Sequence, residues 1–200
     1  MNGQTLSPDH GYPLRIVVPG YTGARWVKWV DRITVAGSES PNFYQQRDYR
    51  ILPSEVETVT QAEAYWDKVQ SIGSLAVNSI IASIKPAPIE GSDMVLVKGY
   101  AMGRGGEDGR VVGVQVSLEG SDKWLDARIT YQEGKWSWTL WECVVNLAVK
   151  TQVAKERDIR KEQKILCRAR DAKGEVQKSE CPWNFRGVAY NAYGMGVWRL

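Results

Sequence analysis

The sequence predicts a mainly β protein, with a β-sandwich in its C-terminal part and a shorter, irregular N-terminal part. From Val77 onward, short segments alternate between apolar and polar residues, which is typical of half-buried strands. Turns that contain Gly, Asp and Ser separate these segments, and this spacing favours two packed antiparallel sheets. The first 52 residues, by contrast, are too few to close a core of their own. We therefore interpret them as part of a larger domain.

The N-terminal part is organised around a short apolar run that ends in a glycine-bearing turn. Residues 16–18 (Ile-Val-Val) are a β-branched run bounded by prolines, and they predict a buried strand. Pro19, Gly20 and Gly23 follow, so the chain turns tightly there and its backbone amides can point at a ligand.

Basic residues surround this turn. Arg15, Arg25 and Lys28 supply positive charge, and His10 is the only imidazole in the chain. Guanidinium and ammonium groups beside backbone amides suit a phosphorylated or oxyanionic ligand. A solvated basic surface is the alternative, because such turns are common on protein surfaces.

Residues 53–68 have helical character and join the two parts. Ser54 and Glu57 have the spacing of a capping box, and residues 61–66 include good helix formers. The pattern indicates a connecting turn or a short helix.

The predicted strands of the C-terminal part are residues 77–84, 94–101, 111–118 and 124–130, then one strand around Trp136, Trp138 and Leu140 and one around Ile165, Cys167 and Ala169. The alternation is clearest in residues 111–118, where Val112, Val114, Val116 and Leu118 are expected on one face. In residues 124–130 the same rule places Leu125, Ala127 and Ile129 together. Residues 155–162 are strongly polar and indicate a solvated loop or a short polar helix.

Composition excludes several classes of partner. Hydrophobic residues make up 43% of the chain and no apolar run is long enough to cross a bilayer, so we expect no membrane partner. The net charge of +3 is small and the basic residues are dispersed, so we expect no nucleic-acid partner.

The cysteines indicate a reducing compartment. Cys143, Cys167 and Cys181 are odd in number and lack the spacing of a disulfide framework or a Cys/His metal site. The first residues are polar and show no signal peptide. We expect an intracellular protein, with the cytoplasm, the mitochondrion and the peroxisome left open.

Two N-terminal stretches resemble a known family. Residues 10–15 (His-Gly-Tyr-Pro-Leu-Arg) and 19–29 (Pro-Gly-Tyr-Thr-Gly-Ala-Arg-Trp-Val-Lys-Trp) resemble the last part of the molybdenum-cofactor domain of the sulfite oxidase and assimilatory nitrate reductase family. The resemblance implies that residues 1–75 are the C-terminal remnant of an α+β molybdopterin-binding domain followed by a linker.

The resemblance continues through the second half. Residues 98–101 (Lys-Gly-Tyr-Ala), 114–120 (Val-Gln-Val-Ser-Leu-Glu-Gly), 136–141 (Trp-Ser-Trp-Thr-Leu-Trp) and 183–188 (Trp-Asn-Phe-Arg-Gly-Val) are similar to the family's C-terminal dimerisation domain. The resemblance implies an immunoglobulin-like β-sandwich over residues 76–200, which pairs with a second copy in a homodimer.

The resemblance also implies a set of cofactor-binding residues. His10, Arg15 and Lys28, with Trp26 and Val27, match the family positions that hold the phosphate and ring of the pterin. Taken alone, His10 equally fits a structural histidine in a turn that contains Pro and Gly. Trp26 departs from the family pattern, which has a smaller residue beside the pterin.

Two further residues match the substrate pocket, and we expect them to be the catalytic residues. Tyr49 follows Arg47-Asp48, as in the Arg-Asp-Tyr of the family's sulfite oxidases, where the tyrosine hydroxyl helps to hold the substrate. Arg186 matches the arginine that the dimerisation domain contributes to the sulfite pocket, and a forked guanidinium suits an oxyanion. The alternatives are a half-buried aromatic for Tyr49 and packing or a salt bridge for Arg186.

One part of the family's metal site has no counterpart in this sequence. In the family, molybdenum is bound by the pterin and by a cysteine from a segment upstream of any residue here. Thiolate ligation suits molybdenum, but the three cysteines lie in the sandwich half, so we assign no metal ligand to this chain. We expect Mo-molybdopterin in the complete protein, without retention of the cofactor or turnover by this chain alone.

Tyr49 and Arg186 together favour sulfite as the substrate. The family's nitrate reductases usually carry Asn and Met at these two places, and singly charged nitrate needs less cationic compensation than doubly charged sulfite or sulfate. The expected reaction is the two-electron oxidation of sulfite to sulfate at the pterin-held molybdenum, with the electron acceptor undetermined. A nitrate reductase and a non-catalytic dimerisation or binding module are the alternatives.

Overall fold

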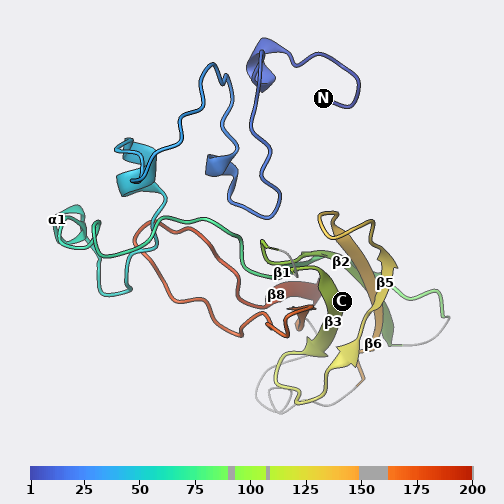
Figure 1. Cartoon of the computed structure of the whole chain (residues 1–200). Helices are drawn as coiled ribbons and strands as arrows, with labels where there is room; N and C mark the ends of the chain where they lie inside the picture. Colours follow the sequence, from blue (N-terminus) through green and yellow to red (C-terminus); the bar gives the residue numbers. More distant parts are fainter. Residues whose placement is uncertain (90–92, 107–108, 149–161, 200) are drawn as a thin grey trace. The chain divides into compact units, whose positions relative to one another are not determined.

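A computed structural model describes residues 1–89, 93–106, 109–148 and 162–199, and the chain divides into two units (Figure 1). Met1–Leu75 and Pro182–Tyr190 form the first, here called the N-terminal unit, and Ala76–Cys181 and Asn191–Leu200 form the second, here called the sandwich. The expected second domain, residues 76–200, includes residues 182–190, whereas in the structure these residues cluster with the first unit. The reason is that Phe185 packs on the apolar cluster of that unit.

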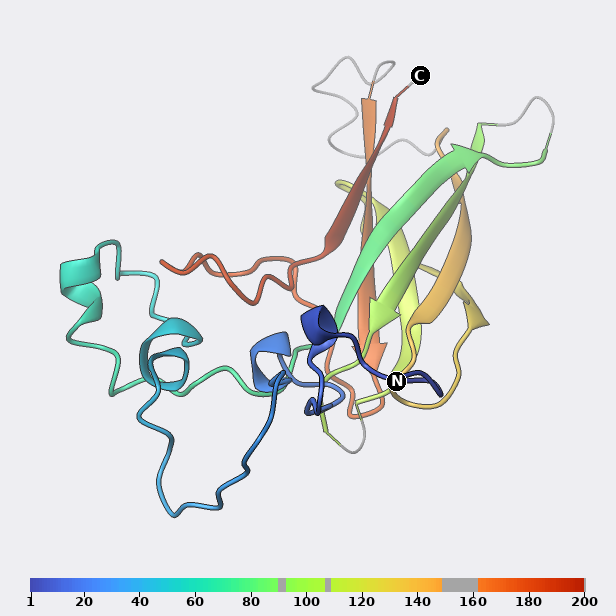
Figure 2. The same cartoon turned by 90° about the horizontal axis from the view of Figure 1, so that it is seen from above.

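The sandwich has two antiparallel four-stranded sheets in two layers (Figure 2). Their orders are β1-β2-β6-β5 and β4-β3-β7-β8. The strands are β1 (Asn78–Pro86), β2 (Met94–Met102), β3 (Val111–Leu118), β4 (Leu125–Asp126), β5 (Arg128–Tyr131), β6 (Thr139–Asn146), β7 (Glu162–Asp171) and β8 (Gly194–Arg199). This arrangement has the strand order of an immunoglobulin-like fold, with β4 as the additional strand beside the third. The predicted fold class is therefore confirmed.

The core of the sandwich is centred on Trp141 of β6. Trp141 is 1% exposed, and its indole N–H donates to the hydroxyl of Ser79 on β1 across 3.1 Å. Gly99 of β2 lies opposite Trp141, and a Cβ there would lie 2.2 Å from the indole ring and 2.1 Å from the carbonyl oxygen of Ile80. Only glycine therefore allows the indole to pack against this strand.

Several strand predictions need correction. A bulge between Val111 and Gly113 turns Val112 outward, so Val111 instead joins Val114 and Val116 in the core. Residues 124–130 are not one strand, because β4 pairs with β3 and β5 pairs with β6 in the other sheet. The chain crosses from one sheet to the other at this point. This crossing leaves Leu125 exposed.

The tryptophan-rich segment also differs from its prediction. Its strand begins only at Thr139, and the buried face carries Thr139 and Trp141, whereas Trp138 and Leu140 are exposed. The prediction for β7 is correct, since Ile165, Cys167 and Ala169 are all buried. Residues 155–161 lie outside the described part of the chain.

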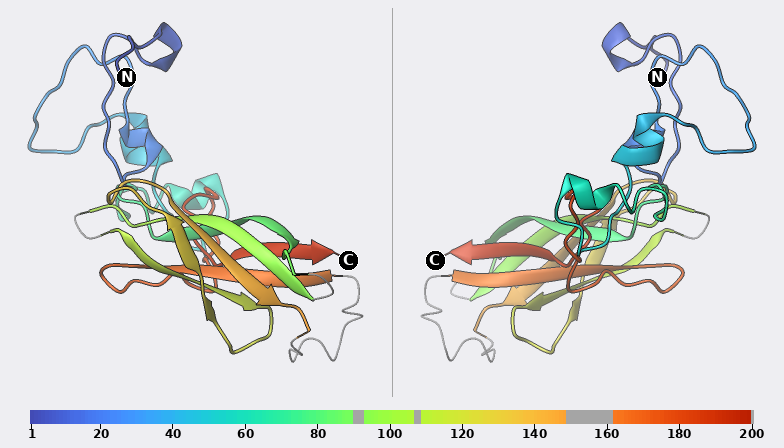
Figure 3. Two further views of the ribbon diagram at one scale, coloured as in Figure 1. Left: turned by 90° about the vertical axis from the view of Figure 1, so that its right-hand side faces the viewer. Right: turned by 90° about the vertical axis from the view of Figure 1, so that its left-hand side faces the viewer.

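The N-terminal unit has little regular structure (Figure 3). It contains short 3₁₀ turns at Pro8–His10 and Gly23–Arg25, a π-helical turn at Tyr44–Asp48, and the short helix α1 (Val59–Ala62). The capping box of α1 is formed by Thr58 and Gln61, so the prediction that used Ser54 and Glu57 is wrong in register. Among the described residues there is no helix with the length and apolar character needed to cross a membrane.

The predicted buried strand at residues 16–18 is also wrong. This segment is extended, but Val17 is exposed and the other two residues are half-buried. It is hydrogen-bonded on one side only, where the Ile16 N–H donates to the Val27 carbonyl and the Val30 N–H to the Leu14 carbonyl. Without further strands beside it among the described residues, an apolar run is not enough to become a core strand.

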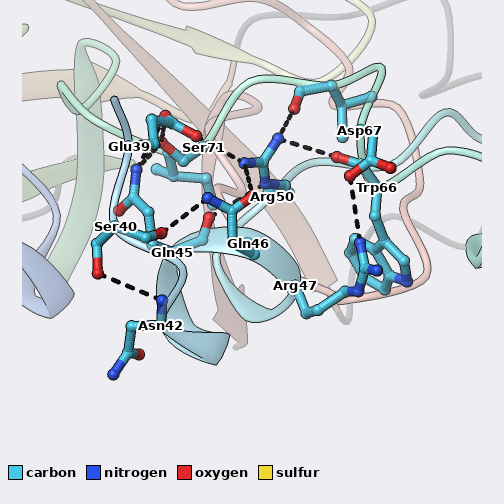
Figure 4. Close-up of polar contacts among 12 residues, drawn as sticks. Glu39, Ser40, Asn42, Gln45, Gln46, Arg47, Arg50, Trp66, Asp67 and Ser71 are labelled. Carbon is cyan, nitrogen blue, oxygen red and sulfur yellow. Dashed lines mark hydrogen bonds and ion pairs between the residues drawn. The ribbon is translucent and has the colours of Figure 1, made fainter. Parts of the chain in front are cut away.

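A small apolar cluster and one buried arginine hold the N-terminal unit together. Leu52, Val56, Ala62 and Trp66 are buried against one another. Beside them lies Arg50, whose guanidinium donates to the backbone carbonyls of Gln45, Trp66 and Val69 and to the side chains of Glu39 and Gln46 (Figure 4). With its side chain 5% exposed, Arg50 is the polar centre of this unit.

Candidate functional site

Arg15 and Lys28 lie beside each other because the chain doubles back between them. The Ile16–Val27 hydrogen bond (2.8 Å) aligns the two segments, so that a Cβ built on Gly11 would contact both the Lys28 and the Arg15 side chains. Gly11 has φ +110°, a conformation that glycine adopts readily and other residues rarely. Two basic side chains are therefore gathered at one tight turn.

The contacts of these side chains keep their charges uncompensated. Arg15 Nη1 donates to the His10 carbonyl at 3.1 Å, and Lys28 Nζ donates to the Asp9 carbonyl at 2.9 Å. Neither forms an ion pair with a carboxylate of the described residues, and Arg15 Nε is buried without a hydrogen-bond partner there. The Lys28 ammonium lies 4.3 Å from the centre of the Trp29 ring, a cation–π contact that positions it.

The other predicted cofactor-binding residues lie in the same segment of the chain. His10 ends the Pro8–His10 turn, and its Nδ1 lies 2.6 Å from the Ser7 hydroxyl. The Trp26 indole N–H donates to the Tyr21 carbonyl, while Val27 is exposed and contributes its carbonyl to the pairing with Ile16. All five predicted residues therefore belong to one hairpin-like segment.

Tyr49 follows directly on the π-helical turn Tyr44–Asp48. Short π-helical turns are rare and are frequently found at functional sites. The Tyr49 backbone carbonyl accepts a hydrogen bond from the Ile72 N–H, and its ring lies 6.5 Å from that of Tyr44. The side chain is half-buried.

Arg186 is presented by a turn that Asn184 stabilises. The Asn184 side chain is buried, donates to the Val188 carbonyl at 2.9 Å and accepts from the Val188 N–H at 3.3 Å. Phe185 anchors this turn on the apolar cluster of the N-terminal unit. Arg186 then reaches the Asp48 carboxylate, with which its Nη2 forms an ion pair. The structure thus brings Arg186 beside the residue that precedes Tyr49.

One backbone segment joins the basic turn to the Tyr49 region. Residues 71–75 pair with residues 20–22 through the Thr22 N–H to Gly73 carbonyl and Leu75 N–H to Gly20 carbonyl bonds. The same segment pairs with Tyr49 and Arg50 through the Ile72 N–H and an isolated bridge at Ser71. Both groups of predicted site residues are therefore built on one backbone framework.

The donor set fits an anion and does not fit a bound metal. Arg15 and Lys28 offer cationic donors of the kind that bind phosphate. The described residues contain no cluster of three His, Cys, Asp or Glu side chains that could bind a metal ion. Burial raises the pKa of Cys143 and of Cys167 to about 11, with Asp126 adding to the effect at Cys143. These buried thiols stay protonated at neutral pH, whereas a molybdenum ligand must be a thiolate.

Comparison with known proteins identifies the family. Residues 1–44 match the model of an oxidoreductase molybdopterin binding domain, and residues 69–195 match that of a Mo-co oxidoreductase dimerisation domain. The chain belongs to the sulfite oxidase family of molybdopterin oxidoreductases. Members of this family use a molybdenum–pterin cofactor, so the predicted family and cofactor class are confirmed.

Relatives in this family include both sulfite oxidases and nitrate reductases. The chain is 33% identical to a sulfite oxidase of Arabidopsis thaliana, 38% identical to the mitochondrial sulfite oxidase of Mus musculus and 35% identical to an NADH nitrate reductase of Spinacia oleracea. These matches cover 96% or more of this chain but only 50%, 34% and 21% of the relatives. The chain thus spans half or less of the length of these family members, and overall identity does not separate sulfite from nitrate.

A solved structure shares the fold. The sulfane dehydrogenase SoxCD from Paracoccus pantotrophus superposes with a TM-score of 0.67 at 26% identity, over 98% of this chain and 46% of that one. The fold of this chain is therefore similar over nearly its whole length to part of that solved structure.

Sequence reasoning missed three residues that shape the site. Asp48 pairs with Arg186, Trp29 positions Lys28, and Asn184 closes the turn that presents Arg186. Asp48 and Asn184 lie in the very motifs that carry the resemblance, directly beside or near the predicted residues. Their places in those motifs could have identified Asp48 and Asn184 as candidate site residues.

Proposed function

We propose that this chain is the part of a sulfite oxidase-type molybdoenzyme that holds the anionic end of the pterin, contributes to the sulfite pocket and forms a homodimer. The bound cofactor supplies the two-electron chemistry that links sulfite and sulfate. This chain supplies basic side chains that bind the cofactor and the substrate, orients the substrate, and forms the homodimer. The observation that supports the proposal is that Arg186, from the second half of the sequence, lies beside Asp48, the residue before Tyr49; the ion pair itself is also the salt bridge named above as the alternative role of Arg186.

Arg15 and Lys28 are suited to the phosphate of the pterin. Their charges are not compensated by any described carboxylate, and the buried Nε of Arg15 is ready to donate. A charge-assisted hydrogen bond to a phosphate is worth roughly twice a neutral one. We assign His10, Trp26 and Val27 to the surrounding wall, in keeping with their places in the same segment.

Arg186 and Tyr49 are suited to the substrate. The guanidinium carries N–H donors on three nitrogens, and its contact with Asp48 uses Nη2. The remaining edge can donate to two oxygens of a sulfur oxyanion at once. Asp48 positions this arginine, and the Tyr49 hydroxyl adds a neutral donor that stabilises a bound anion without adding net charge.

The preference for sulfite over nitrate follows from charge. A doubly charged anion gains more from a guanidinium than a singly charged one does. The family's nitrate reductases usually have Met in place of this arginine, whereas this chain has Arg186, whose guanidinium also pairs with the Asp48 carboxylate. For this reason we favour sulfite, although the overall identities to the two kinds of relative are similar.

The molybdenum itself needs a thiolate ligand, and we propose that another part of the complete protein supplies it. Cys143 and Cys167 are buried in the sandwich as thiols. We propose that this chain alone does not retain the metal. The homodimer is supported by the match of residues 69–195 to a dimerisation-domain model.

The test is an assay of the natural protein, purified from its source. We expect bound molybdenum, oxidation of sulfite with an artificial electron acceptor, and much slower reduction of nitrate. Faster turnover of nitrate would overturn the sulfite assignment and favour a nitrate reductase. Absence of molybdenum and of both activities would instead favour a non-catalytic dimerisation module.

A further inference from the structure

Arg25 is one of the basic residues that surround the glycine-bearing turn, yet it has no role in the candidate site. It ends the 3₁₀ turn Gly23–Arg25, directly before the predicted cofactor-binding residues at 26–28. Its side chain is half-buried, and the hydrogen bonds that it donates among the described residues reach neutral oxygen atoms of Ile72 and Gln45. Arg25 therefore reaches away from the turn to which it belongs in sequence.

One contact of Arg25 leads through the backbone of Ile72 to Tyr49. Arg25 Nε donates to the Ile72 carbonyl at 2.9 Å, and the Ile72 N–H donates to the Tyr49 carbonyl at 2.6 Å. Because both bonds involve the backbone of the same residue, a shift of Ile72 relative to Arg25 also changes its contact with Tyr49. The backbone of Tyr49 is thus tied to the residue that precedes the predicted cofactor-binding segment.

The second contact of Arg25 leads to Gln45, near the start of the π-helical turn. Arg25 Nη1 donates to the side-chain oxygen of Gln45. The amide nitrogen of Gln45 donates to the Glu39 carboxylate at 3.0 Å and to the Ser71 hydroxyl at 2.9 Å (Figure 4). This hydrogen bond from Gln45 is the main reason that the pKa of Glu39 lies below its usual value. With a cation beside its oxygen and an anion beside its nitrogen, the amide can form both contacts in one orientation only.

Arg25 therefore holds the π-helical turn Tyr44–Asp48 at both ends. Gln45 lies near the beginning of this turn, and Tyr49 follows its last residue. Arg50 adds a contact within the same segment, because its Nε donates to the Gln45 carbonyl at 3.1 Å. Loss of Arg25 would release the backbone from which the Tyr49 side chain projects.

The third nitrogen of Arg25 adds nothing to the stability of this unit. Arg25 Nη2 is buried and has no hydrogen-bond partner among the described residues. A buried donor without a partner destabilises a fold, so such groups are rare and call for an explanation. Local arrangements that are not optimal for stability are expected where a functional site requires them.

We propose that Arg25 is a positioning residue that fixes Tyr49 relative to the cofactor-binding residues of the basic turn. This inference rests on the proposed function, because it takes the Tyr49 hydroxyl as a donor to the substrate. The role depends on the forked shape of the guanidinium, whose Nε and Nη1 reach two different acceptors. A lysine would keep the charge, but its single nitrogen does not reproduce the fork.

The first test is a double-mutant cycle on the natural holoenzyme, with kcat/KM for sulfite and an artificial electron acceptor as the readout. Tyr49→Phe removes one donor to the substrate, and we expect kcat/KM to fall by about 10-fold. Arg25→Met should cause a similar decrease, because the Tyr49 hydroxyl is then present but misplaced. The double variant should also lie about 10-fold below the wild type, whereas independent effects would multiply to about 100-fold.

Arg25→Lys separates position from charge. If Arg25 acts through Tyr49, the lysine variant should lose about as much kcat/KM as Arg25→Met. Wild-type kcat/KM in Arg25→Lys would overturn the proposal, because a cation at this place would then be sufficient. Arg47→Met is the matched control, since Arg47 belongs to the same π-helical turn and forms its ion pair with the exposed Asp67. It should keep the wild-type value.

The second test needs no cofactor. Hydrogen–deuterium exchange of the Ile72 amide in the full chain reports on its hydrogen bond to Tyr49. We expect Arg25→Met to accelerate this exchange by about 10-fold and Arg47→Met to leave it unchanged. If circular dichroism shows that Arg25→Met does not fold, Gln45→Leu replaces it in both tests, with effects in the same direction, because it removes the second contact of Arg25 alone.

The outcomes distinguish this inference from the proposed function. Effects of Arg25→Met and Tyr49→Phe that multiply, or unchanged Ile72 exchange in Arg25→Met, would contradict the positioning role and leave the sulfite pocket in place. Unchanged kcat/KM in Arg25→Met, with Tyr49→Phe impaired, would do the same. Unchanged kcat/KM in Tyr49→Phe would instead overturn the assignment of Tyr49 to the substrate, and the positioning role with it.

Discussion

In the sandwich, strands of both sheets contribute side chains to one apolar core around Trp141, whereas the N-terminal unit buries only a small cluster around Leu52. That unit relies instead on hydrogen bonds, above all those of the buried Arg50 guanidinium. The predicted cofactor and substrate residues all lie in the N-terminal unit, including Arg186, which reaches it from the second half of the sequence.

The contrast shows that the two units differ in what stabilises them and in which of them carries the predicted site residues. An apolar core is insensitive to the order of polar residues around it, so the sandwich can provide stability and a surface for assembly. In the N-terminal unit, Arg15 and Lys28 lie at one turn, where hydrogen bonds to backbone carbonyls hold their side chains in place. Each of the following changes affects one unit and should leave the other intact.

The largest effect is expected for Gly99→Ala. The added methyl group would lie 2.1 Å from a backbone oxygen and 2.2 Å from the Trp141 ring, neither of which can move freely. We expect the free energy of unfolding of the sandwich to fall by about 4 kcal/mol, as measured by urea denaturation. Gly113→Ala is the control, because a Cβ there approaches only the end of the Arg170 side chain, at 4.0 Å. Equal stability of the two variants would contradict the packing described for Trp141.

Arg50→Met should have the next largest effect, confined to the N-terminal unit. It removes a buried guanidinium and leaves the Gln45, Trp66 and Val69 carbonyls without their donor, a loss of about 3 kcal/mol. Hydrogen–deuterium exchange should then accelerate in the N-terminal unit while β2 and β6 keep their protection. Arg47→Met is the control, since the ion pair that Arg47 forms among the described residues is with the exposed Asp67, at 3.5 Å. Loss of protection in both units at once would show that they do not unfold separately.

The smallest effect concerns the thiol of Cys167 at high pH. Its pKa is raised from 9.0 to about 11 by burial, so the folded sandwich holds a proton that the unfolded chain releases first. Stability should therefore fall as the pH rises from about 9 towards about 11, by about 1 kcal/mol per pH unit. Urea denaturation at several pH values measures this slope, which Cys167→Ala should reduce.

Prediction from sequence worked where the pattern was local. The span of β3 and the buried face of Ile165, Cys167 and Ala169 followed from alternation alone. The apolar run at residues 16–18 failed, because burial needs neighbouring strands that the run itself does not specify. Likewise, the bulge at Val111 and the sheet crossing before β5 depend on partner strands, which a single segment does not reveal.

The candidate site likewise has a part that could be predicted from the sequence and a part that could not. The basic residues near the Gly11 turn are close in sequence, so their convergence was predictable from spacing and resemblance. The contact between Arg186 and Asp48 joins residues 138 positions apart. Only the resemblance indicated Arg186, and nothing in the local pattern indicated that Asp48 would bind it. The catalytic and cofactor-binding roles themselves remain predictions.

The most direct test of the central claim is the Michaelis constant for sulfite of the natural holoenzyme that carries Arg186→Met. If Arg186 holds the substrate, losing a charge-assisted hydrogen bond should raise KM for sulfite by about 10-fold or more. The Arg47→Met holoenzyme, altered at an arginine two residues from Tyr49, should keep the wild-type value. An unchanged KM in Arg186→Met, with sulfite oxidation intact, would contradict the claim that this arginine binds the substrate.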